Sequence, residues 1–456
     1  MQALLFGPFL NEPLERDEGA YAYIAQRLSA GELPYRDIYD HKPPAVYFIY
    51  AAIFKLMGQS ILSIRLFTLF YCMLTTLSLF AVGYLLWGRI GGMLSALLYA
   101  FFSGGPYIQG TSANTETFMV LPMVLALYCF LRGTRDGGRG TVTNLFLAGI
   151  FSGLAVMIKQ VAVANFLVLV GFAGLISLIP LLLGFTTFPL IFTLFFWLRG
   201  ALPDFINAML FENLAYVAGK TFRWGGFFWT VTRENLILWL LVIFSTAYIL
   251  FRERKPENLL LSGWAIFSVL GVVLGRSFYG HYFIQAIPGL VLMSSYALLK
   301  LSRHSLSAAA GMLVFLFLTL PVLSSRYPFH FMSGDEISVQ KYGIYNFVLA
   351  KEAAQFIRQK SSGNNTIYVW GAEPEIYFYS QRRAASKFIY FYPLLENSGR
   401  GKERRLEMMG EMRQNSPQYI ILADAGVGYP VLFDLLKTKY RFLAKIDRWQ
   451  IWEIKK

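Results

Sequence analysis

Acidic and basic side chains gather near the start of this chain, whose sequence is apolar almost everywhere else. Residues 15 to 50 read "ERDEGAYAYIAQRLSAGELPYRDIYDHKPPAVYFIY". Asp17 and Glu18 precede an amphipathic helical pattern, and the N-terminus of a helix stabilises a carboxylate in its ionised form. Such an acid is suited to accept a proton or to orient a nucleophile, but a plain helix cap explains Asp17 equally well. For Glu18 the alternative is a solvated helix face.

His41 and Lys42 stand directly before Pro43 and Pro44, which suit the first turn of a helix. A cation at the positive end of a helix is unfavourable unless an anion compensates it. A phosphate bound jointly by the helix N-terminus and Lys42 would supply that anion. The alternative for Lys42 is a side chain that reaches to a lipid headgroup, and for His41 it is a structural hydrogen bond.

The composition places the chain among polytopic membrane proteins. Its 456 residues are 56% hydrophobic, 17% aromatic and only 15% charged, which is more apolar than a soluble globular protein tolerates. A membrane span needs roughly 20 apolar residues. We expect spans near residues 61–87, 90–109, 116–131, 144–159, 161–177, 180–199, 235–251, 258–275, 283–299 and 306–323. Residues 1–10 look like the end of a truncated first span, which makes about eleven.

Basic residues in short loops stay on the cytoplasmic side of a membrane. In this chain they fall on one side of the expected spans, at Arg89, Arg132, Arg135, Arg139, Arg252, Arg254, Lys255, Lys300 and Arg303. Residues 11–60 therefore lie outside the cytoplasmic membrane, with Glu116, Lys159 and the turn "GRSFYGHYF" on the same side. The segment after Pro43 is too short to cross, and we expect an interfacial or re-entrant helix there.

Further candidates lie at the outer ends of the expected spans. Glu116 opens a span, and its alternative is an ordinary acidic helix start. Arg65 and Lys159 also stand at outer ends, where interface anchors are common. The turn "GRSFYGHYF" brings together four more side chains: Arg276, Tyr279, His281 and Tyr282. The alternative for the two tyrosines is the aromatic belt at a membrane surface.

Four domains follow from these patterns: the remnant at 1–10, an extracytoplasmic loop at 11–60, to which the resemblance described below assigns catalysis, a multi-span domain at 61–325 and a soluble extracytoplasmic α/β domain at 326–456. In the last, "NTIYVWGA" and "QYIILADAG" predict strands, whereas "NFVLAKEAAQFIRQK" and "PVLFDLLKTK" predict helices. Cys72 and Cys129 lie inside expected spans, which suggests neither a disulfide nor a metal site. No nucleic-acid motif is seen.

Several motifs resemble those of GT-C membrane glycosyltransferases, in the group that holds protein O-mannosyltransferases and lipid A aminoarabinose transferases. The resemblance rests on "RDEGAYAYIAQRL", "YDHKPPAVYF", "SANTETFMVLPMVLALYCFLR", "LPDFINAMLFENLAYVAG", "FYGHYFIQAIPGLVL" and "IYVWGAEPEIYFYSQR". Such enzymes transfer a sugar from a polyprenyl phosphate to an acceptor outside the cytoplasmic membrane. The resemblance implies an all-α GT-C-like membrane part followed by the small α/β domain.

The same resemblance implies roles for the candidate residues. Asp17 matches the acid of the first outer loop, which acts as catalytic base or orients the acceptor, and Glu116 matches a second functional acid. Glu18 is the third candidate catalytic acid. The phosphate of the donor would be held by His41, Lys42, Arg65, Lys159, Arg276 and His281, with Tyr279 and Tyr282 in the donor or acceptor pocket.

We expect an inverting-type transfer, by a hexosyl- or pentosyltransferase, to a lipid, protein or glycan acceptor. A lipid phosphate leaves readily, so no cofactor is required, although a divalent cation shared by Asp17 and Glu116 is left open. One alternative function is a secondary transporter, but transporters place ionisable groups near the bilayer midplane rather than at one outer face. The other is a catalytically idle scaffold with this fold.

Overall fold

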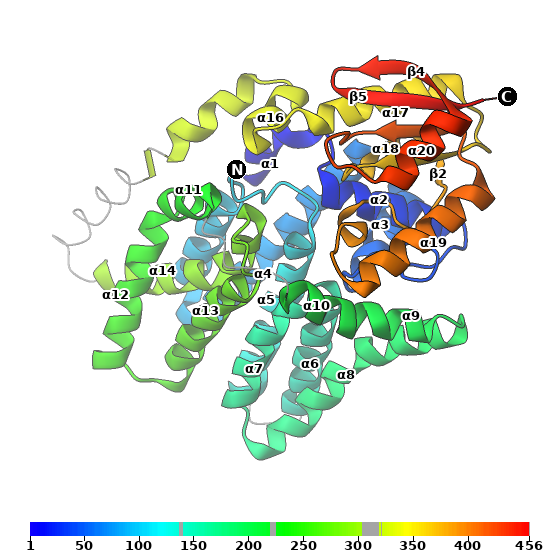
Figure 1. The fold of residues 1–456 in the computed structure, drawn as a ribbon. Coiled ribbons are helices and arrows are strands. Elements are labelled where there is room, and N and C mark those ends of the chain that lie inside the picture. The colour runs from blue at the N-terminus through cyan, green and yellow to red at the C-terminus, as the bar shows by residue number, and fades with distance from the viewer. Residues whose placement is uncertain (136–139, 219–224, 303–318, 321, 456) are drawn as a thin grey trace.

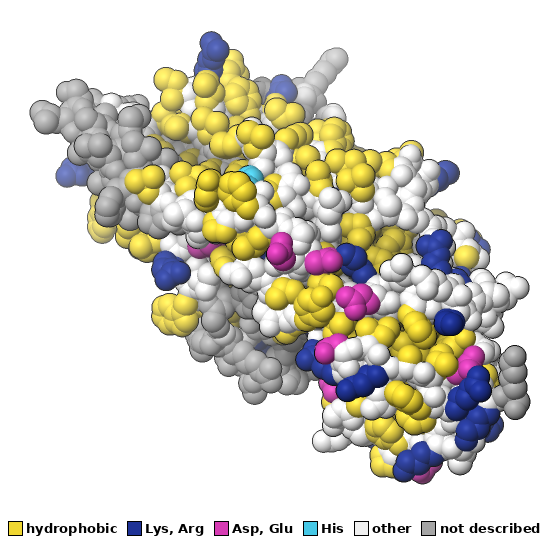
Figure 2. All heavy atoms as spheres, turned by 90° about the horizontal axis from the view of Figure 1, so that it is seen from above, with side chains coloured by type: hydrophobic (Ala, Val, Ile, Leu, Met, Phe, Trp, Pro, Cys, Tyr) yellow, Lys and Arg dark blue, Asp and Glu magenta, His cyan; other side chains and the backbone are white. Residues whose placement is uncertain are grey.

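The computed structural model describes residues 1–135, 140–218, 225–302, 319–320 and 322–455. Figure 1 shows two parts: a set of long helices, and an α/β part of mixed strands and helices at one end of that set. Figure 2 looks down on the molecule and shows hydrophobic side chains over much of the helical part, whereas Lys, Arg, Asp and Glu are interspersed over the α/β part.

Five helices in the described residues are long and apolar enough to cross a membrane: α4 (Ile61–Phe102), α5 (Thr115–Arg135), α6 (Gly140–Ile158), α8 (Leu175–Leu198) and α13 (Pro256–Leu274). A sixth span results if α11 (Gly226–Glu234) and α12 (Leu236–Arg252), bent by 72° at their junction, are counted together. Shorter apolar helices are α3 (Ala45–Met57), α7 (Val163–Phe172) and α14 (Ile287–Leu301). The chain is therefore an integral membrane protein.

α4 is two helices joined by a sharp turn. Gly88 has φ 73°, a left-handed conformation that glycine adopts without strain. The two halves pack closely, because a Cβ added to Gly83 would lie 2.6 Å from the Gly91 carbonyl oxygen. This break separates the two spans expected at 61–87 and 90–109. Of the other expected spans, the one at 306–323 lies mostly outside the described residues, and the total of about eleven crossings stays a prediction.

Short elements connect the long helices. They include α1 (Gln2–Phe6), η1 (Gly7–Asn11), η2 (Gln160–Ala162), α9 (Leu202–Ile206), η3 (Asn207–Glu212), α10 (Asn213–Ala218) and η4 (Gly280–Gln285). The amphipathic helix expected after Asp17 and Glu18 is present as α2 (Arg16–Ser29), and both acids lie in its first turn rather than before it. It begins with a capping box. The Glu15 side chain accepts a hydrogen bond from the Glu18 backbone N–H, and the Glu18 side chain accepts one from the Glu15 backbone N–H.

The α/β part holds one mixed sheet with strand order β2-β1-β3-β5-β4. β1 (Thr366–Trp370) pairs in parallel with β2 (Arg383–Ala384) and β3 (Tyr419–Leu422), whereas β5 (Trp449–Ile454) pairs antiparallel with β3 and with β4 (Tyr440–Ile446). Its helices are η5 (Tyr327–Phe331), α16 (Gly334–Tyr342), α17 (Asn346–Lys360), α18 (Glu375–Ser380), η6 (Tyr392–Leu394), α19 (Gly399–Asn415) and α20 (Pro430–Lys439). The two strands and two helices predicted from the sequence of this region are confirmed.

The α/β part packs directly on α2 and α3. Gly19 of α2 lies against α18, where a Cβ would come within 2.4 Å of the Glu375 Cβ. The rings of Tyr23 and Tyr377 lie 5.1 Å apart, and a stacked aromatic pair, Phe54 and Phe378, joins α3 to the same helix. α2 is therefore packed between the membrane helices and the α/β part, and this packing fixes the position of its first turn.

Candidate active site

Asp17 and Lys42 face each other at the start of α2. The Lys42 Nζ lies 3.5 Å from the Asp17 Oδ2, and the two side chains are 20% and 35% exposed, so the pair is open on one side. The same ammonium lies 5.7 Å from the centre of the Tyr21 ring. The sequence predicts a phosphate beside Lys42; in this structure the carboxylate of Asp17 lies there, and the phosphate contact stays a prediction.

A second acid occupies the matching position of another helix. Glu116 is the second residue of α5, as Asp17 is of α2, and its side chain is buried. Its Oε1 accepts a hydrogen bond from the Lys159 Nζ and lies 3.8 Å from the His281 Nε2, while its Oε2 accepts from the Thr115 hydroxyl at 2.8 Å. Both acids thus combine a helix N-terminus with nearby cations.

These groups form one electrostatic cluster. Burial alone would raise the pKa of Asp17, but Lys42 above all, together with His281, Arg16 and Lys159, lowers it to about 2. Asp17 is therefore ionised at neutral pH. Burial lowers the pKa of His281, as do Lys159 and Lys42, against the opposing effect of Glu116 and Asp17. The cluster joins segments more than 250 residues apart in the sequence.

Aromatic rings line the cluster on the side of η4. The Lys159 ammonium lies 4.2 Å from the centre of the Tyr282 ring, a cation–π contact. His281 is stacked with Tyr279 at 5.8 Å and is edge-on to Tyr282 at 4.9 Å. Tyr279 is 46% exposed. Of the expected group, the structure therefore brings together Asp17, Lys42, Glu116, Lys159, His281, Tyr279 and Tyr282.

Residues around His281 have unusual backbone conformations. Gln109, Arg276 and Phe278 all have φ between 47° and 58°, which costs energy for any residue except glycine. The Gln109 Oε1 lies 2.9 Å from the His281 Nδ1. A Cβ on Gly280 would meet the Tyr107 carbonyl oxygen at 1.9 Å, so this loop and η4 are in direct backbone contact. Gln109 could not be found from the sequence, because its partner His281 lies 172 residues away.

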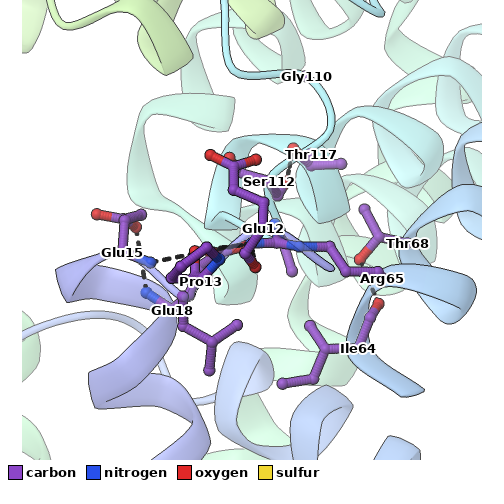
Figure 3. A network of polar contacts seen from close by, with 12 residues as sticks. Glu12, Pro13, Glu15, Glu18, Ile64, Arg65, Thr68, Gly110, Ser112 and Thr117 are labelled. Carbon is purple, nitrogen blue, oxygen red and sulfur yellow. Dashed lines mark hydrogen bonds and ion pairs between the residues drawn. The ribbon is translucent and has the colours of Figure 1, made fainter. Parts of the chain in front are cut away.

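Glu18 and Arg65 form a separate and sealed pair, drawn in Figure 3. Their side chains are 0% and 2% exposed. Arg65 donates to both carboxylate oxygens of Glu18, with Nη2 at 2.9 Å from Oε2, and it also reaches the carbonyls of Glu12 and Pro13 at 3.3 Å. Glu18 Oε1 accepts from the Ala113 N–H at 2.6 Å. The catalytic role expected for Glu18 and the phosphate contact expected for Arg65 stay predictions, and the geometry points to a positioning role instead.

His41 and Arg276 are the two remaining candidates. Burial, together with Lys42, lowers the pKa of His41 to about 4, so this side chain is neutral at neutral pH. Its backbone N–H donates to Asp40 at 2.6 Å and its carbonyl accepts from Asn213 at 2.6 Å. Arg276 follows the end of α13, and its backbone N–H donates to the Val273 carbonyl at 3.0 Å. Their phosphate contacts stay predictions.

The described residues contain no group of three or more His, Cys, Asp or Glu side chains that could hold a metal ion. Cys72 and Cys129 are free and buried there. Of the candidate residues, Asp17 and Glu116 would supply carboxylates to a divalent cation, and Lys42 and Lys159 are paired with them in this structure.

Two family models match parts of the sequence. The family model described as dolichyl-phosphate-mannose-protein mannosyltransferase matches residues 41–202. A second model, for the C-terminal domain of the competence-induced protein Ccs4, matches residues 350–455. No curated protein matches the sequence.

Solved structures match over almost the whole chain. ArnT from Cupriavidus metallidurans bound to undecaprenyl phosphate has a TM-score of 0.71 and 16% identity, with 99% of this chain and 96% of that chain covered. The Archaeoglobus fulgidus oligosaccharyltransferase tethered to an acceptor peptide has a TM-score of 0.56 and 13% identity, covering 92% and 68%. The archaeal oligosaccharyltransferase AglB from the same organism, in complex with an inhibitory peptide and a dolichol-phosphate, has a TM-score of 0.53 and 13% identity, also covering 92% and 68%. The chain therefore has the fold of the GT-C membrane glycosyltransferases, and its predicted resemblance to the protein mannosyltransferase and aminoarabinose transferase group of that class is confirmed.

Proposed function

We propose that this protein is a glycosyltransferase that moves a sugar from a polyprenyl phosphate to an acceptor on the extracytoplasmic side of the cytoplasmic membrane. The observation that carries the proposal is the open pair of Asp17 and Lys42 beside Glu116, Lys159 and His281. Polyprenyl phosphates are also what two similar structures hold, undecaprenyl phosphate in ArnT and a dolichol-phosphate in AglB.

Lys42 binds the phosphate of the donor in this proposal, with Lys159 and His281 nearby. A phosphate competes with Asp17 for the Lys42 ammonium, because both are anions that accept charge-assisted hydrogen bonds. The pair is partly exposed, so an incoming phosphate can reach it. The helix that follows Lys42 adds its positive N-terminus to the same place.

The transfer is a single displacement. The acceptor oxygen or nitrogen forms a bond to the anomeric carbon, the bond from that carbon to the phosphate oxygen breaks, and its electron pair leaves with the polyprenyl phosphate. Asp17 takes or orients the proton that the acceptor loses, which is worth typically 10² to 10⁴-fold in rate. Lys42 and Lys159 stabilise the negative charge that develops on the leaving phosphate. The anomeric centre is inverted.

Donor binding also activates the base. A carboxylate whose pKa is about 2 is a poor proton acceptor at neutral pH. Lys42 is the cation that lowers this pKa most. When Lys42 turns to the phosphate, the negative charge of the phosphate and the loss of the ion pair raise the pKa of Asp17 toward its ordinary value. The acid therefore becomes a better base only when the donor is in place.

No metal ion takes part in this scheme, because lysine side chains supply the positive charge. Transfer should therefore continue after a chelator has removed divalent cations. Loss of transfer on chelation, with recovery on adding Mg²⁺ or Mn²⁺, would favour the alternative in which Asp17 and Glu116 share a cation.

The decisive experiment uses purified protein, a panel of radiolabelled polyprenyl-phosphate hexoses and pentoses, and membrane extract as the source of acceptors. We expect one donor to label a lipid, protein or glycan fraction, and Asp17→Asn to abolish the labelling. Labelling that is equal in the wild type and in Asp17→Asn would contradict the proposal.

The extracytoplasmic location of the α/β part is tested by a reporter that is fused after Lys456 and is active only in the cytoplasm. This reporter should stay silent.

A further inference from the structure

A pocket of about 450 Å³ opens at the edge of the sheet in the α/β part, within the usual size range of small-molecule sites. Two of its lining segments directly follow parallel strands. Ala372 and Glu373 come after β1, and residues 423 to 426 come after β3. The pocket therefore lies at the carboxyl ends of two neighbouring parallel strands.

The sheet topology makes this position significant. From β1 the chain moves to β2 on one side of β1, and then returns through α19 to β3 on the other side. The connections that leave β1 and β3 therefore diverge, and a crevice opens between them. Open α/β sheets bind their ligands in such a crevice, at the point where the strand order reverses.

Arg16 connects this pocket to the candidate active site. It is the residue before Asp17, and it lines the pocket. Its Nε donates to the Ala372 carbonyl at 2.7 Å, and its guanidinium lies 5.3 Å from the centre of the Tyr392 ring. Tyr392 is 49% exposed. Burial raises the pKa of Tyr392, and Glu373, Tyr279 and Asp17 add to that effect against Arg16.

The lining side chains combine both signs of charge with an aromatic face. Glu373 is 3% exposed and is held by the Asn346 amide at 2.8 Å and the Ala372 N–H at 2.6 Å. Asp424 and Arg448 complete the polar lining. Carboxylates accept hydrogen bonds from hydroxyl groups, guanidinium groups donate them in a fixed fork, and an exposed tyrosine ring covers an apolar C–H face. This set suits an uncharged polyhydroxyl group better than an anion or a hydrocarbon chain.

We propose that this pocket binds the sugar end of a glycan acceptor and presents one of its hydroxyl groups to Asp17. The inference rests on the proposed function, which it deepens by assigning the class of acceptor. Arg16, which is adjacent in sequence to Asp17, lies on the side of the pocket that faces the site of transfer, and the Tyr392 ring lies against it. The α/β part is thus the acceptor-recognition part of the protein.

The test is a titration of soluble disaccharides into the full-length protein in detergent, with maltose, mannobiose and diacetylchitobiose as probes, followed by saturation-transfer NMR. Asp424→Asn removes the carboxylate that follows β3. Asp434→Asn, on the exposed side of α20, is the matched control. We expect at least one disaccharide to bind the wild type and the control equally, and Asp424→Asn about tenfold more weakly, as loss of a charged hydrogen bond predicts.

Two results of the disaccharide titration would overturn the inference: no disaccharide binds the wild type, or Asp424→Asn binds as well as the control. Binding of a Ser- or Thr-containing peptide to this pocket in place of the sugars would also overturn it, in favour of a protein acceptor. Because the titration does not involve Lys42 or the donor, its outcome is independent of the donor experiment. Failure of the proposed donor site would leave the disaccharide result unchanged.

Discussion

Asp17 and Glu18 are adjacent carboxylates on one helix, each paired with a cation, and the structure treats them in opposite ways. Asp17 is 35% exposed and meets Lys42 at 3.5 Å, whereas Glu18 is fully buried and receives two hydrogen bonds from Arg65 and one from Ala113. One step along a helix turns a side chain by about 100°. That step separates an acid with room for a substrate from an acid whose hydrogen-bonding capacity is used by the protein itself.

The difference between the two pairs is also energetic. A partly exposed ion pair adds little to stability, typically 0 to about 1 kcal/mol. Removing one partner of a buried pair leaves an uncompensated charge and costs about 3–5 kcal/mol. Glu18 and Arg65 should therefore matter for folding, whereas Asp17 and Lys42 should matter for the reaction.

The largest effect is expected from Asp17→Asn. The amide keeps the shape of the side chain but accepts no proton, so turnover should fall by about 10² to 10⁴-fold. The melting temperature in detergent should stay within experimental error of the wild type. Transfer near the wild-type rate would show that Asp17 is only part of the helix start.

Glu18→Gln should have the opposite profile. It leaves the Arg65 guanidinium buried without its counter-charge, and the free energy of unfolding should fall by about 3–5 kcal/mol. The double variant Glu18→Leu with Arg65→Met removes both charges and should recover much of that loss. If Glu18→Gln lost turnover with an unchanged melting temperature, the sealed pair would have a chemical role as expected from the sequence.

Glu116→Gln tests whether Glu116 acts in the reaction, as proposed for Asp17, or mainly stabilises the fold, as expected for Glu18. Lys159 loses its carboxylate partner, so its position should loosen while its charge stays available to a phosphate. We expect turnover to fall by about 10- to 100-fold, the value of a charged hydrogen bond, with donor affinity retained. Weaker donor binding at unchanged turnover would place Glu116 in donor recognition only.

Glu15 gives the smallest expected effect, a dependence of stability on pH. Burial raises the pKa of Glu15 to about 8, helped by the charges of Asp17 and Glu18 and opposed by backbone hydrogen bonds. The folded protein thus holds a proton that the unfolded chain releases near pH 4.5. The contribution of Glu15 to the free energy of unfolding is fully present below pH 4.5 and is lost as the pH rises toward about 8.

Glu15→Gln should flatten the fall in melting temperature between pH 5 and 8 by a few °C. The amide keeps an oxygen that can accept the Glu18 backbone N–H, so the cap is preserved. A profile parallel to that of the wild type would mean that Glu15 is already ionised in the folded protein.

Much of this arrangement was predictable because it is encoded locally. The strands and helices of the α/β part follow from short apolar periodicities, and the starts of α2 and α5 follow from their acidic first turns. The counter-ion of each acid was not predictable. Arg65 lies 47 residues from Glu18, and the buried pair of Glu12 and Lys341 spans 329. Only the packed fold decides which of two adjacent acids meets which cation.

The central claim is that the open pair is where the donor phosphate binds. It is tested most directly by titrating undecaprenyl phosphate into the wild type, Lys42→Ala and Lys55→Ala. Lys55 lies on the exposed side of α3, close in sequence to Lys42, and is a matched control. Loss of a charged hydrogen bond, about 1.5–3 kcal/mol, should weaken binding to Lys42→Ala by about one to two orders of magnitude and leave Lys55→Ala unchanged. Equal affinity in all three proteins would contradict the account and make Lys42 a counter-ion of Asp17 and nothing more.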